Sequence, residues 1–262
     1  MNLVAILAGG VGARMGITIP KQFLEFAGRT VLEHSVQAFE NHPSVDKILI
    51  VMNSDYVDEA KAIIQRNNWP KVCGVIIGGN NRYDSSAAAI DYFFSNDPTD
   101  KLLIHDAARP LVSLKTVEEV IAAARQYGAA IAAVPEKNTV KVVNEDNIVV
   151  RTPERSLIWE VQTPQGFNCG VLKAAYRQAE RDGFLGTDDA SLVERLGKPV
   201  KVVQSEYENI KITTPGDMTI AEAFLHGSGL EEAKESVSSF LSGAAEKLLG
   251  KQAGSGKRKT KA

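Results

Sequence analysis

The chain has 262 residues, of which 44% are hydrophobic and 24% are charged, and its formal net charge is −2. This profile is typical of a globular protein with one large α/β domain or two small ones, and it disfavours a bulk nucleic-acid binder. No apolar run approaches the roughly 18 residues that cross a bilayer, and Cys73 and Cys169 form no CxxC motif, so we expect a protein of the reducing cytoplasm without a cysteine metal site.

The first half of the sequence alternates between apolar runs and amphipathic stretches. The opening MNLVAILAGG lacks the basic segment of a signal peptide and is better interpreted as a first strand. Strands are predicted at residues 3–7, 47–52, 72–77, 101–104 and 130–134, and helices at 30–41, 55–67, 82–94 and 115–126. Ser54 and Ser113 are the expected N-caps of the second and fourth helices. The alternation predicts a Rossmann-like α/β fold, with a mostly parallel sheet covered by helices on both faces.

This rhythm breaks after Pro135. The segment NTVKVVNEDNIVVRT contains two β-rich runs around the turn-forming NEDN, which predicts an inserted β-hairpin arm at about residues 136–156. A lone hairpin cannot bury both of its faces. We therefore expect a homodimer that forms through this arm.

The remaining third of the chain begins with more α/β pattern and ends in a basic tail. Helices are predicted at 169–182 and 188–196, strands at 199–204 and 209–213, and a further helix with Thr214 as N-cap and Pro215 at its first position. An apolar stripe at helical spacing follows, and then a run rich in Gly, Ser and Lys. The expected organisation is one domain at 1–226, an appended amphipathic helix at 227–249 and a disordered basic tail at 250–262.

A glycine cluster follows the first strand, in LAGGVGARMGITIPKQF at residues 7–23. Open parallel sheets bind ligands at this edge, beyond the carboxyl ends of their strands. The segment matches neither the GxxxxGK[ST] phosphate loop nor the GxGxxG dinucleotide motif, and a plain tight turn is the alternative. Its cations, Arg14 and Lys21, have no acidic neighbour, and together with backbone N–H groups they suit a triphosphate.

The motif HDAARP closes the fourth predicted strand, so Asp106 and Arg109 should emerge at the same edge as the glycine cluster. A carboxylate beside a phosphate site indicates a cation between them, and we expect Mg²⁺ held chiefly by phosphate oxygens and water. A strand-end cap is the alternative for Asp106. His105 should face away from Asp106 and is interpreted as structural.

Together these segments resemble the sugar-nucleotidyltransferases, and specifically the cytidylyltransferases that act on 2-C-methyl-D-erythritol 4-phosphate or on ribitol 5-phosphate. The resemblance covers about residues 2–225. It also includes GGNNRYDSS, NTVKVV, TPERSLIWEVQTPQGF, TDDASLVE and ENIKITTPGDM, in the order of the family. The resemblance implies a fold of the nucleotide-diphospho-sugar transferase type and a nucleotidyltransferase domain at 1–226.

The resemblance also implies the site residues. The catalytic cations would be Arg14, Lys21 and Lys211. The nucleotide-binding residues would be Ala8, Gly9, Gly10, Gly12, Gly79, Ser85 and Asp106, with Gly79 and Ser85 facing the cytosine. The acceptor-binding residues would be Asp106, Arg109, Thr139, Arg155 and Thr213, with Thr139 and Arg155 reaching across a dimer interface. Asp106 would also hold the metal. The family often has an acidic residue where Asn80 stands, which leaves that contact open, and Arg82 could equally be a surface or intra-loop residue.

The implied reaction is an in-line attack of the acceptor phosphate on the α-phosphorus of CTP, which expels pyrophosphate and needs no Ser, Cys or His nucleophile. HDAARP, Lys141 and TDDAS favour 2-C-methyl-D-erythritol 4-phosphate, and hence isoprenoid precursor synthesis. ILAGGVGARMG and EYENIKITT keep ribitol 5-phosphate, and thus CDP-ribitol, as the alternative. An NAD-binding oxidoreductase with Asp55 as its ribose-binding acid, or an inactive binding module, fits the basic residues less well.

Overall fold

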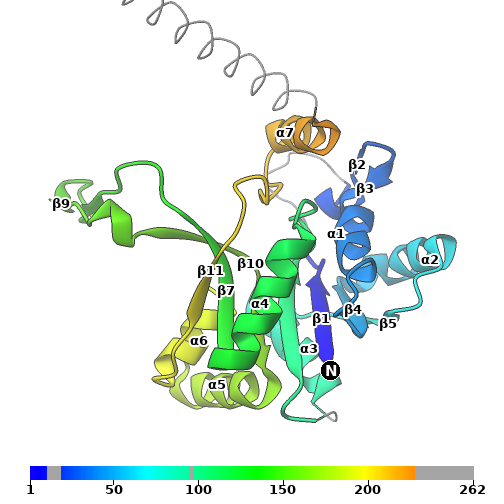
Figure 1. Cartoon of the computed structure of the whole chain (residues 1–262), viewed down its shortest axis with the longest axis horizontal. Helices are drawn as coiled ribbons and strands as arrows, with labels where there is room; N and C mark the ends of the chain where they lie inside the picture. Colours follow the sequence, from blue (N-terminus) through cyan, green and yellow to red (C-terminus); the bar gives the residue numbers. More distant parts are fainter. Residues whose placement is uncertain (11–18, 95–96, 228–262) are drawn as a thin grey trace, which may run out of the picture.

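The computed structural model describes residues 1–10, 19–94 and 97–227. Within them a seven-stranded sheet has the order β11-β7-β10-β6-β1-β4-β5 (Figure 1). Its strands are β1 (Asn2–Leu7), β4 (Lys47–Met52), β5 (Val72–Ile77), β6 (Lys101–Asp106), β7 (Ala129–Pro135), β10 (Trp159–Asn168) and β11 (Lys201–Gln204). All neighbouring pairs are parallel except those of β10, which is antiparallel to β6 and to β7. The predicted α/β class is confirmed.

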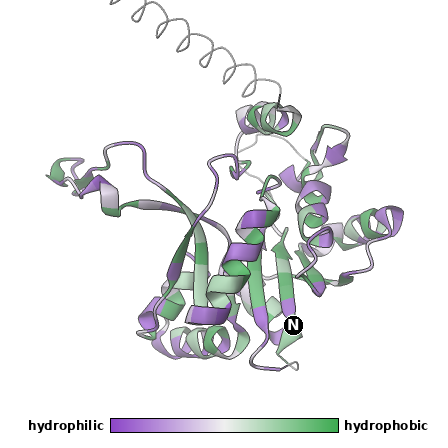
Figure 2. Cartoon of the chain, viewed as in Figure 1, coloured by the Kyte–Doolittle hydropathy of each residue, from purple (hydrophilic) through white to green (hydrophobic). Residues whose placement is uncertain are grey.

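Helices cover both faces of the sheet because alternate residues of the central strand enter different cores. Leu3 and Ala5 pack into one core with α3 (Arg82–Phe93), α5 (Cys169–Asp182) and α6 (Asp189–Arg195). Val4 and Ile6 pack into the other core with α1 (Val31–Glu40), α2 (Val57–Asn67) and α4 (Leu114–Tyr127). Figure 2 shows the consequence, with apolar strands between helices whose outer faces are hydrophilic. Because the central strands are buried on both faces, their sequences are continuous apolar runs rather than alternating ones.

Two predicted helix starts have different outcomes. Ser113 caps α4 as expected, because its Oγ accepts a hydrogen bond from the Thr116 N–H at 3.1 Å. Ser54 does not cap α2. The Asn53 side chain caps a short 3₁₀ helix, η3 (Ser54–Tyr56), by accepting from the Asp55 N–H, and α2 follows without a side-chain cap. The chain thus begins to coil one residue earlier than expected.

The predicted arm is a hairpin of β8 (Val142–Val143) and β9 (Val149–Arg151), followed by the 3₁₀ helix η4 (Arg155–Leu157). It projects away from the body of the molecule (Figure 1). Ile148 is 63% exposed and Val150 is 64% exposed. Both apolar side chains therefore find little packing within this chain.

The remaining elements are the strands β2 (Glu25–Phe26) and β3 (Arg29–Thr30), the 3₁₀ helix η2 (Lys21–Phe23), and α7 (Pro215–His226). Pro215 occupies the first position of α7, as predicted. The strand predicted at 209–213 is wrong, because this segment is an extended loop in which the Ile212 N–H bonds the Ala108 carbonyl. No helix of the described residues is long and apolar enough to cross a membrane. Gly12, Arg14, nearly all of the predicted helix at 227–249 and the tail at 250–262 lie outside the described residues.

Candidate active site

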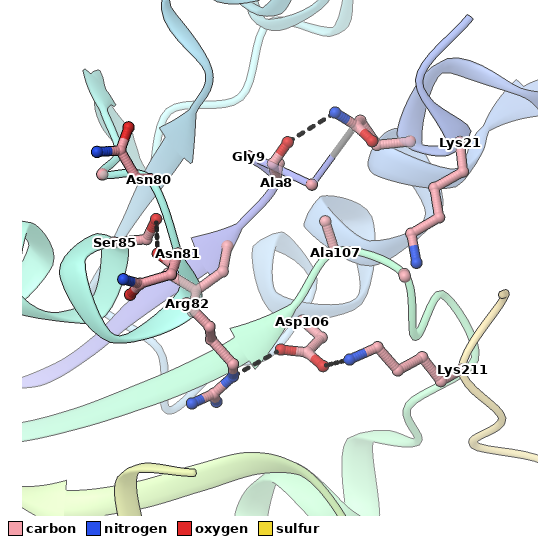
Figure 3. Close-up of a pocket in the computed structure, with 15 residues that line it drawn as sticks. Ala8, Gly9, Lys21, Asn80, Asn81, Arg82, Ser85, Asp106, Ala107 and Lys211 are labelled. Atoms are coloured by element: carbon pink, nitrogen blue, oxygen red, sulfur yellow. Dashed lines mark hydrogen bonds and ion pairs between the residues drawn. The ribbon is translucent and has the colours of Figure 1, made fainter. Parts of the chain in front are cut away.

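Three loops meet at the carboxyl edge of the sheet because β1 runs parallel to both β4 and β6, its neighbours. They are the glycines after β1, the segment between β5 and α3, and the turn after β6. They enclose a cavity of about 210 Å³. Its lining residues are Leu7, Ala8, Gly9, Gly10, Lys21, Gln22, Gly79, Asn80, Asn81, Arg82, Ser85, Asp106, Ala107, Ala108 and Lys211 (Figure 3). The described nucleotide-binding residues and two of the predicted catalytic cations thus line one cavity.

Two glycines of this cavity have different reasons to be glycine. A β-carbon on Gly79 would lie 2.0 Å from the β-carbon of Asp84, so packing against the start of α3 excludes any larger residue. A β-carbon on Gly10 would meet no described atom within 4 Å. The fold around Gly10 therefore does not require glycine, whereas a ligand that approaches the backbone closely would require it.

Gln22 holds the start of the glycine turn. Its side chain is buried, and its Nε2 donates a hydrogen bond to the Ala8 carbonyl at 2.7 Å. This bond fixes the direction in which the chain leaves β1. Gln22 was not predicted as a site residue, although it stands beside Lys21 in the PKQF segment.

Asp106 lies at the centre of the site. Its Oδ2 is 2.5 Å from the Lys211 ammonium, and its Oδ1 is 3.4 Å from Nε of Arg82 (Figure 3). Burial alone would raise the pKa of Asp106, but Lys211 and Arg82 outweigh it and hold the pKa well below its usual range. Asp106 is therefore ionised and already balanced by two side chains, which weakens the argument that a metal must stand beside it.

Arg82, for which a surface or intra-loop position was an equal alternative, lines the cavity. It is the first residue of α3, and its Nη1 lies 2.7 Å from Oδ2 of the fully buried Asp189. Burial alone would lower the pKa of Arg82, but the carboxylates of Asp189 and Asp106 raise it above its ordinary value. A signal was present in the sequence, since the start of α3 follows the carboxyl end of β5 at the ligand edge.

Lys21 and Ser85 reach the same cavity from opposite sides. The Lys21 ammonium donates to the Ile212 carbonyl at 2.9 Å, which ties η2 to the loop that carries Lys211. The Ser85 hydroxyl donates to the Asn81 carbonyl at 2.9 Å. Both side chains therefore have fixed positions on the cavity wall.

A second cavity of about 440 Å³ shares Arg82, Asp106 and Lys211 with the first. Its other lining residues are Arg109, Val161, Gln162, Thr163, Gln165, Thr187, Asp188, Ser191 and Glu194. Arg109 is 8% exposed, and its Nη1 donates to the Asn209 carbonyl at 2.7 Å, while its buried Nε has no hydrogen-bond partner among the described residues. The structure therefore brings Asp106 and Arg109 together, as their spacing predicted.

His105 is structural, as expected. It is fully buried, and its Nε2 donates to the Arg109 carbonyl at 3.0 Å while its Nδ1 lies 3.1 Å from the Thr163 hydroxyl. A carbonyl oxygen can only accept, so the Nε2 position carries the proton. Burial lowers the pKa of His105 to about 4, which keeps the ring neutral.

Three predicted acceptor residues line neither cavity within the described part of the chain. Thr139 and Arg155 are exposed on the arm, and Arg155 donates to the Lys137 carbonyl at 3.3 Å. Thr213 bonds the Asp217 carboxylate at 2.9 Å, at the start of α7. The roles of these residues stay predictions.

Known proteins match almost all of the described chain. A family model described as 2-C-methyl-D-erythritol 4-phosphate cytidylyltransferase matches residues 2–227. An enzyme of that description from Bacillus cytotoxicus is 44% identical over 226 residues, which are 86% of this chain and 98% of the relative. One from Desulforamulus reducens is 42% identical over 226 residues, or 86% of this chain and 96% of the relative. The crystal structure of 4-diphosphocytidyl-2C-methyl-D-erythritol synthase from Anaerococcus prevotii superposes with a TM-score of 0.75 at 31% identity, covering 86% of this chain and 96% of that one.

Proposed function

The chain belongs to the 2-C-methyl-D-erythritol 4-phosphate cytidylyltransferase family, and from this premise we propose how its residues divide the reaction between them. It is a nucleotidyltransferase that couples CTP with 2-C-methyl-D-erythritol 4-phosphate, giving the CDP-alcohol and pyrophosphate for isoprenoid precursor synthesis. Family membership decides against the oxidoreductase that the glycine turn alone allowed. Cys73 and Cys169 of this chain are both free thiols, which supports the proposal that the enzyme works in the reducing cytoplasm.

The first cavity is the CTP site in this proposal. Backbone groups at Ala8, Gly9 and Gly10 would approach the triphosphate, as the open space at Gly10 supports. Gly79 and Ser85 would face the cytosine from the opposite wall. Gly12 and Arg14, which lie outside the described residues, would complete the loop around the phosphates.

The second cavity is the acceptor site. Its volume falls within the roughly 300 to 1,000 Å³ that small-molecule sites occupy. Arg109 is a largely buried cation on its wall, which suits an anionic or hydroxylated ligand. Asp106 would accept a hydrogen bond from an acceptor hydroxyl. Thr213, two residues after Lys211, would also contact the acceptor in this proposal.

The wall shared by the two cavities is the observation that carries this assignment. Asp106, Lys211 and Arg82 line both spaces, so an acceptor phosphate and a nucleotide α-phosphate would meet beside two cations. An oxygen of the acceptor phosphate attacks the α-phosphorus, a new P–O bond forms, and the bond to the β-phosphate breaks as pyrophosphate leaves. Lys21, Lys211 and Arg14 would stabilise the negative charge that moves onto the leaving group.

Mg²⁺ fits this site only in part. The described residues contain no group of three or more His, Cys, Asp or Glu side chains that could hold a metal ion, so phosphate oxygens and water would supply most ligands. Asp106 would meet the ion through water, because each of its oxygens already has a cation beside it, Lys211 at Oδ2 and Arg82 at Oδ1. The remaining lone pairs of the carboxylate would accept from water or from an acceptor hydroxyl. When bound, the ion would neutralise charge on the triphosphate.

A homodimer would complete the acceptor site. Thr139 and Arg155 lie on an arm that projects from the body, and the arm exposes apolar side chains. A second copy could accept that arm and receive Arg155 beside the acceptor phosphate. The proposed site is thus built from two chains.

An acceptor panel tests the function. The purified protein is given CTP and Mg²⁺ with 2-C-methyl-D-erythritol 4-phosphate or with ribitol 5-phosphate, and pyrophosphate release is followed; ATP, GTP and UTP replace CTP in parallel. We expect turnover to be fastest with CTP and 2-C-methyl-D-erythritol 4-phosphate, and to stop when EDTA removes the metal. Faster turnover with ribitol 5-phosphate would contradict the acceptor, and full activity in EDTA would contradict the metal.

A further inference from the structure

Behind the shared wall, Arg82 is held by a second, deeper carboxylate. Asp189 is fully buried, and its Oδ2 lies 2.7 Å from Nη1 of Arg82. Its Oδ1 accepts a hydrogen bond from the Tyr176 hydroxyl at 2.6 Å. Contacts thus run without a break from Tyr176 through Asp189 and Arg82 to Asp106 and on to Lys211.

Each oxygen of Asp189 has its own partner, Tyr176 at Oδ1 and Arg82 at Oδ2. A buried carboxylate is costly unless it is paired and hydrogen-bonded, and Asp189 uses one oxygen for each partner. Burial and the charge of Asp189 both raise the pKa of Tyr176, so its hydroxyl stays protonated and keeps donating. With one oxygen fixed by Tyr176, the other oxygen faces Arg82.

The position of Asp189 connects it to the second cavity. Asp189 is the first residue of α6, and its neighbours Thr187, Asp188 and Ser191 line that cavity. Arg82 contacts Asp189 through Nη1 and Asp106 through Nε, so two carboxylates fix the plane of one rigid guanidinium. Arg82 therefore cannot turn fully onto Asp106 while Asp189 holds it.

We propose that Asp189 is a positioning residue that sets acceptor affinity through Arg82. By holding the guanidinium back at 3.4 Å from Asp106, it leaves Lys211 as the closest partner of Asp106 and leaves the second cavity open. Without the charge on Asp189, Arg82 shifts onto Asp106 and occupies the space and the oxygen that an acceptor hydroxyl would use. This inference rests on the assignment of the second cavity to the acceptor.

The test compares Asp189→Asn with the wild type in steady-state kinetics on both substrates. We expect KM for the acceptor to rise about tenfold or more, as the loss of one charge-linked contact implies. KM for CTP and kcat should change much less because, although Arg82 also lines the first cavity, the glycine turn and Lys21 that would hold the triphosphate are not touched. Tyr176→Phe, which removes only the hydroxyl bond to Asp189, should shift the acceptor KM in the same direction by a smaller factor. Equal changes in the two KM values would overturn the proposal.

A double variant shows whether Asp189 acts through Arg82. Arg82→Met leaves Asp189 buried without its cation, so this variant should unfold at a lower temperature than the wild type. Adding Asp189→Asn should recover part of that stability and should leave the acceptor KM of Arg82→Met unchanged. A further rise in the acceptor KM would show that Asp189 acts independently of Arg82 and would overturn the proposal.

Glu33→Gln is the matched control. Glu33 is also a buried carboxylate that pairs with an arginine, Arg66, at 2.8 Å, but it lines neither cavity. Its loss should lower the unfolding temperature and leave both KM values unchanged. A wild type without activity on either polyol phosphate would sink the proposed function itself, whereas an active wild type with an unchanged acceptor KM in Asp189→Asn and Tyr176→Phe would sink only the positioning role.

Discussion

The proposed mechanism uses residues from two regions with opposite surroundings, the arm at 136–156 and the junction, which consists of Asp106, Arg82, Lys211 and Asp189. At the junction, Asp106 and Arg82 are largely buried, and each is fixed by two oppositely charged groups. On the arm, Thr139 and Arg155 are exposed among apolar side chains that find little packing. In the proposed mechanism, one chain thus preorganises the cations that meet the triphosphate, whereas the arm of a second copy would supply a further cation to the acceptor phosphate.

The largest effect is expected where the junction is broken directly. Lys211→Ala should lower kcat/KM on the order of 10² to 10³, the usual cost of one charge-stabilising group. The fold should persist, because the Lys211 side chain is 38% exposed and Arg82 remains beside Asp106. Pyrophosphate release and a thermal unfolding curve measure the two effects. A loss of less than about threefold would remove Lys211 from the catalytic group.

Arg155→Ala tests the arm. We expect kcat/KM to fall about 10- to 100-fold through KM for the acceptor, because a charge-assisted hydrogen bond to a phosphate is lost. Stability should not change, since the exposed Arg155 side chain has one described bond, to the Lys137 carbonyl, and the backbone bond from the Ile158 N–H is kept in the variant. Unchanged acceptor kinetics would take Arg155 out of the site.

Mixing two weakly active variants sharpens this prediction. If Arg155 serves the partner's site, a mixed dimer of Arg155→Ala and Lys211→Ala chains contains one site with both residues intact. Half of randomly formed dimers are mixed, so the mixture should regain roughly a quarter of wild-type activity. If Arg155 serves its own chain, every site lacks one residue and no activity returns.

The fold was predictable from the sequence wherever the hydrophobic pattern of a single strand or helix is enough to identify it. Buried parallel strands such as β1 are continuous apolar runs, so the run itself identifies the strand and its position in the core. β10 was missed because its middle, Gln162 to Gly166, is polar and contains a proline and a glycine, and only pairing with β6 and β7 makes it a strand. The opposite error occurred at 209–213, where apolar alternation suggested a strand but no neighbouring strand accepts it.

The site was less predictable than the fold because partners far apart in the chain define it. Strand ends placed Asp106 and Arg109 correctly, since their edge follows from the strand direction alone. The same reasoning places Arg82 at this edge, after the carboxyl end of β5, but its proposed role depends on Asp189, which lies 107 positions further along the sequence. Gln22 is similar, since its bond to Ala8 becomes visible only when η2 folds back on β1.

The last prediction concerns the pH dependence of folding stability, which should come from His105 beside Asp106 rather than from the arm. At neutral pH this effect is the smallest of those predicted. Burial lowers the pKa of His105 to about 4 from an ordinary 6.5. Between these values the unfolded chain binds a proton that the folded chain does not, so stability falls as pH drops through this window and is unaffected by His105 above it. The loss should reach on the order of 3 kcal/mol by pH 4.

Urea unfolding of the wild type and of His105→Gln at a series of pH values measures this contribution. The difference in slope between the two proteins isolates His105, because every other titrating group is common to both. His34→Gln is the control, since burial also lowers the pKa of His34, but that ring is only half-buried and should account for a smaller part. Equal pH slopes for the wild type and His105→Gln would mean that the ring charges without cost, and that the turn from Asp106 to Arg109 is held by its other bonds.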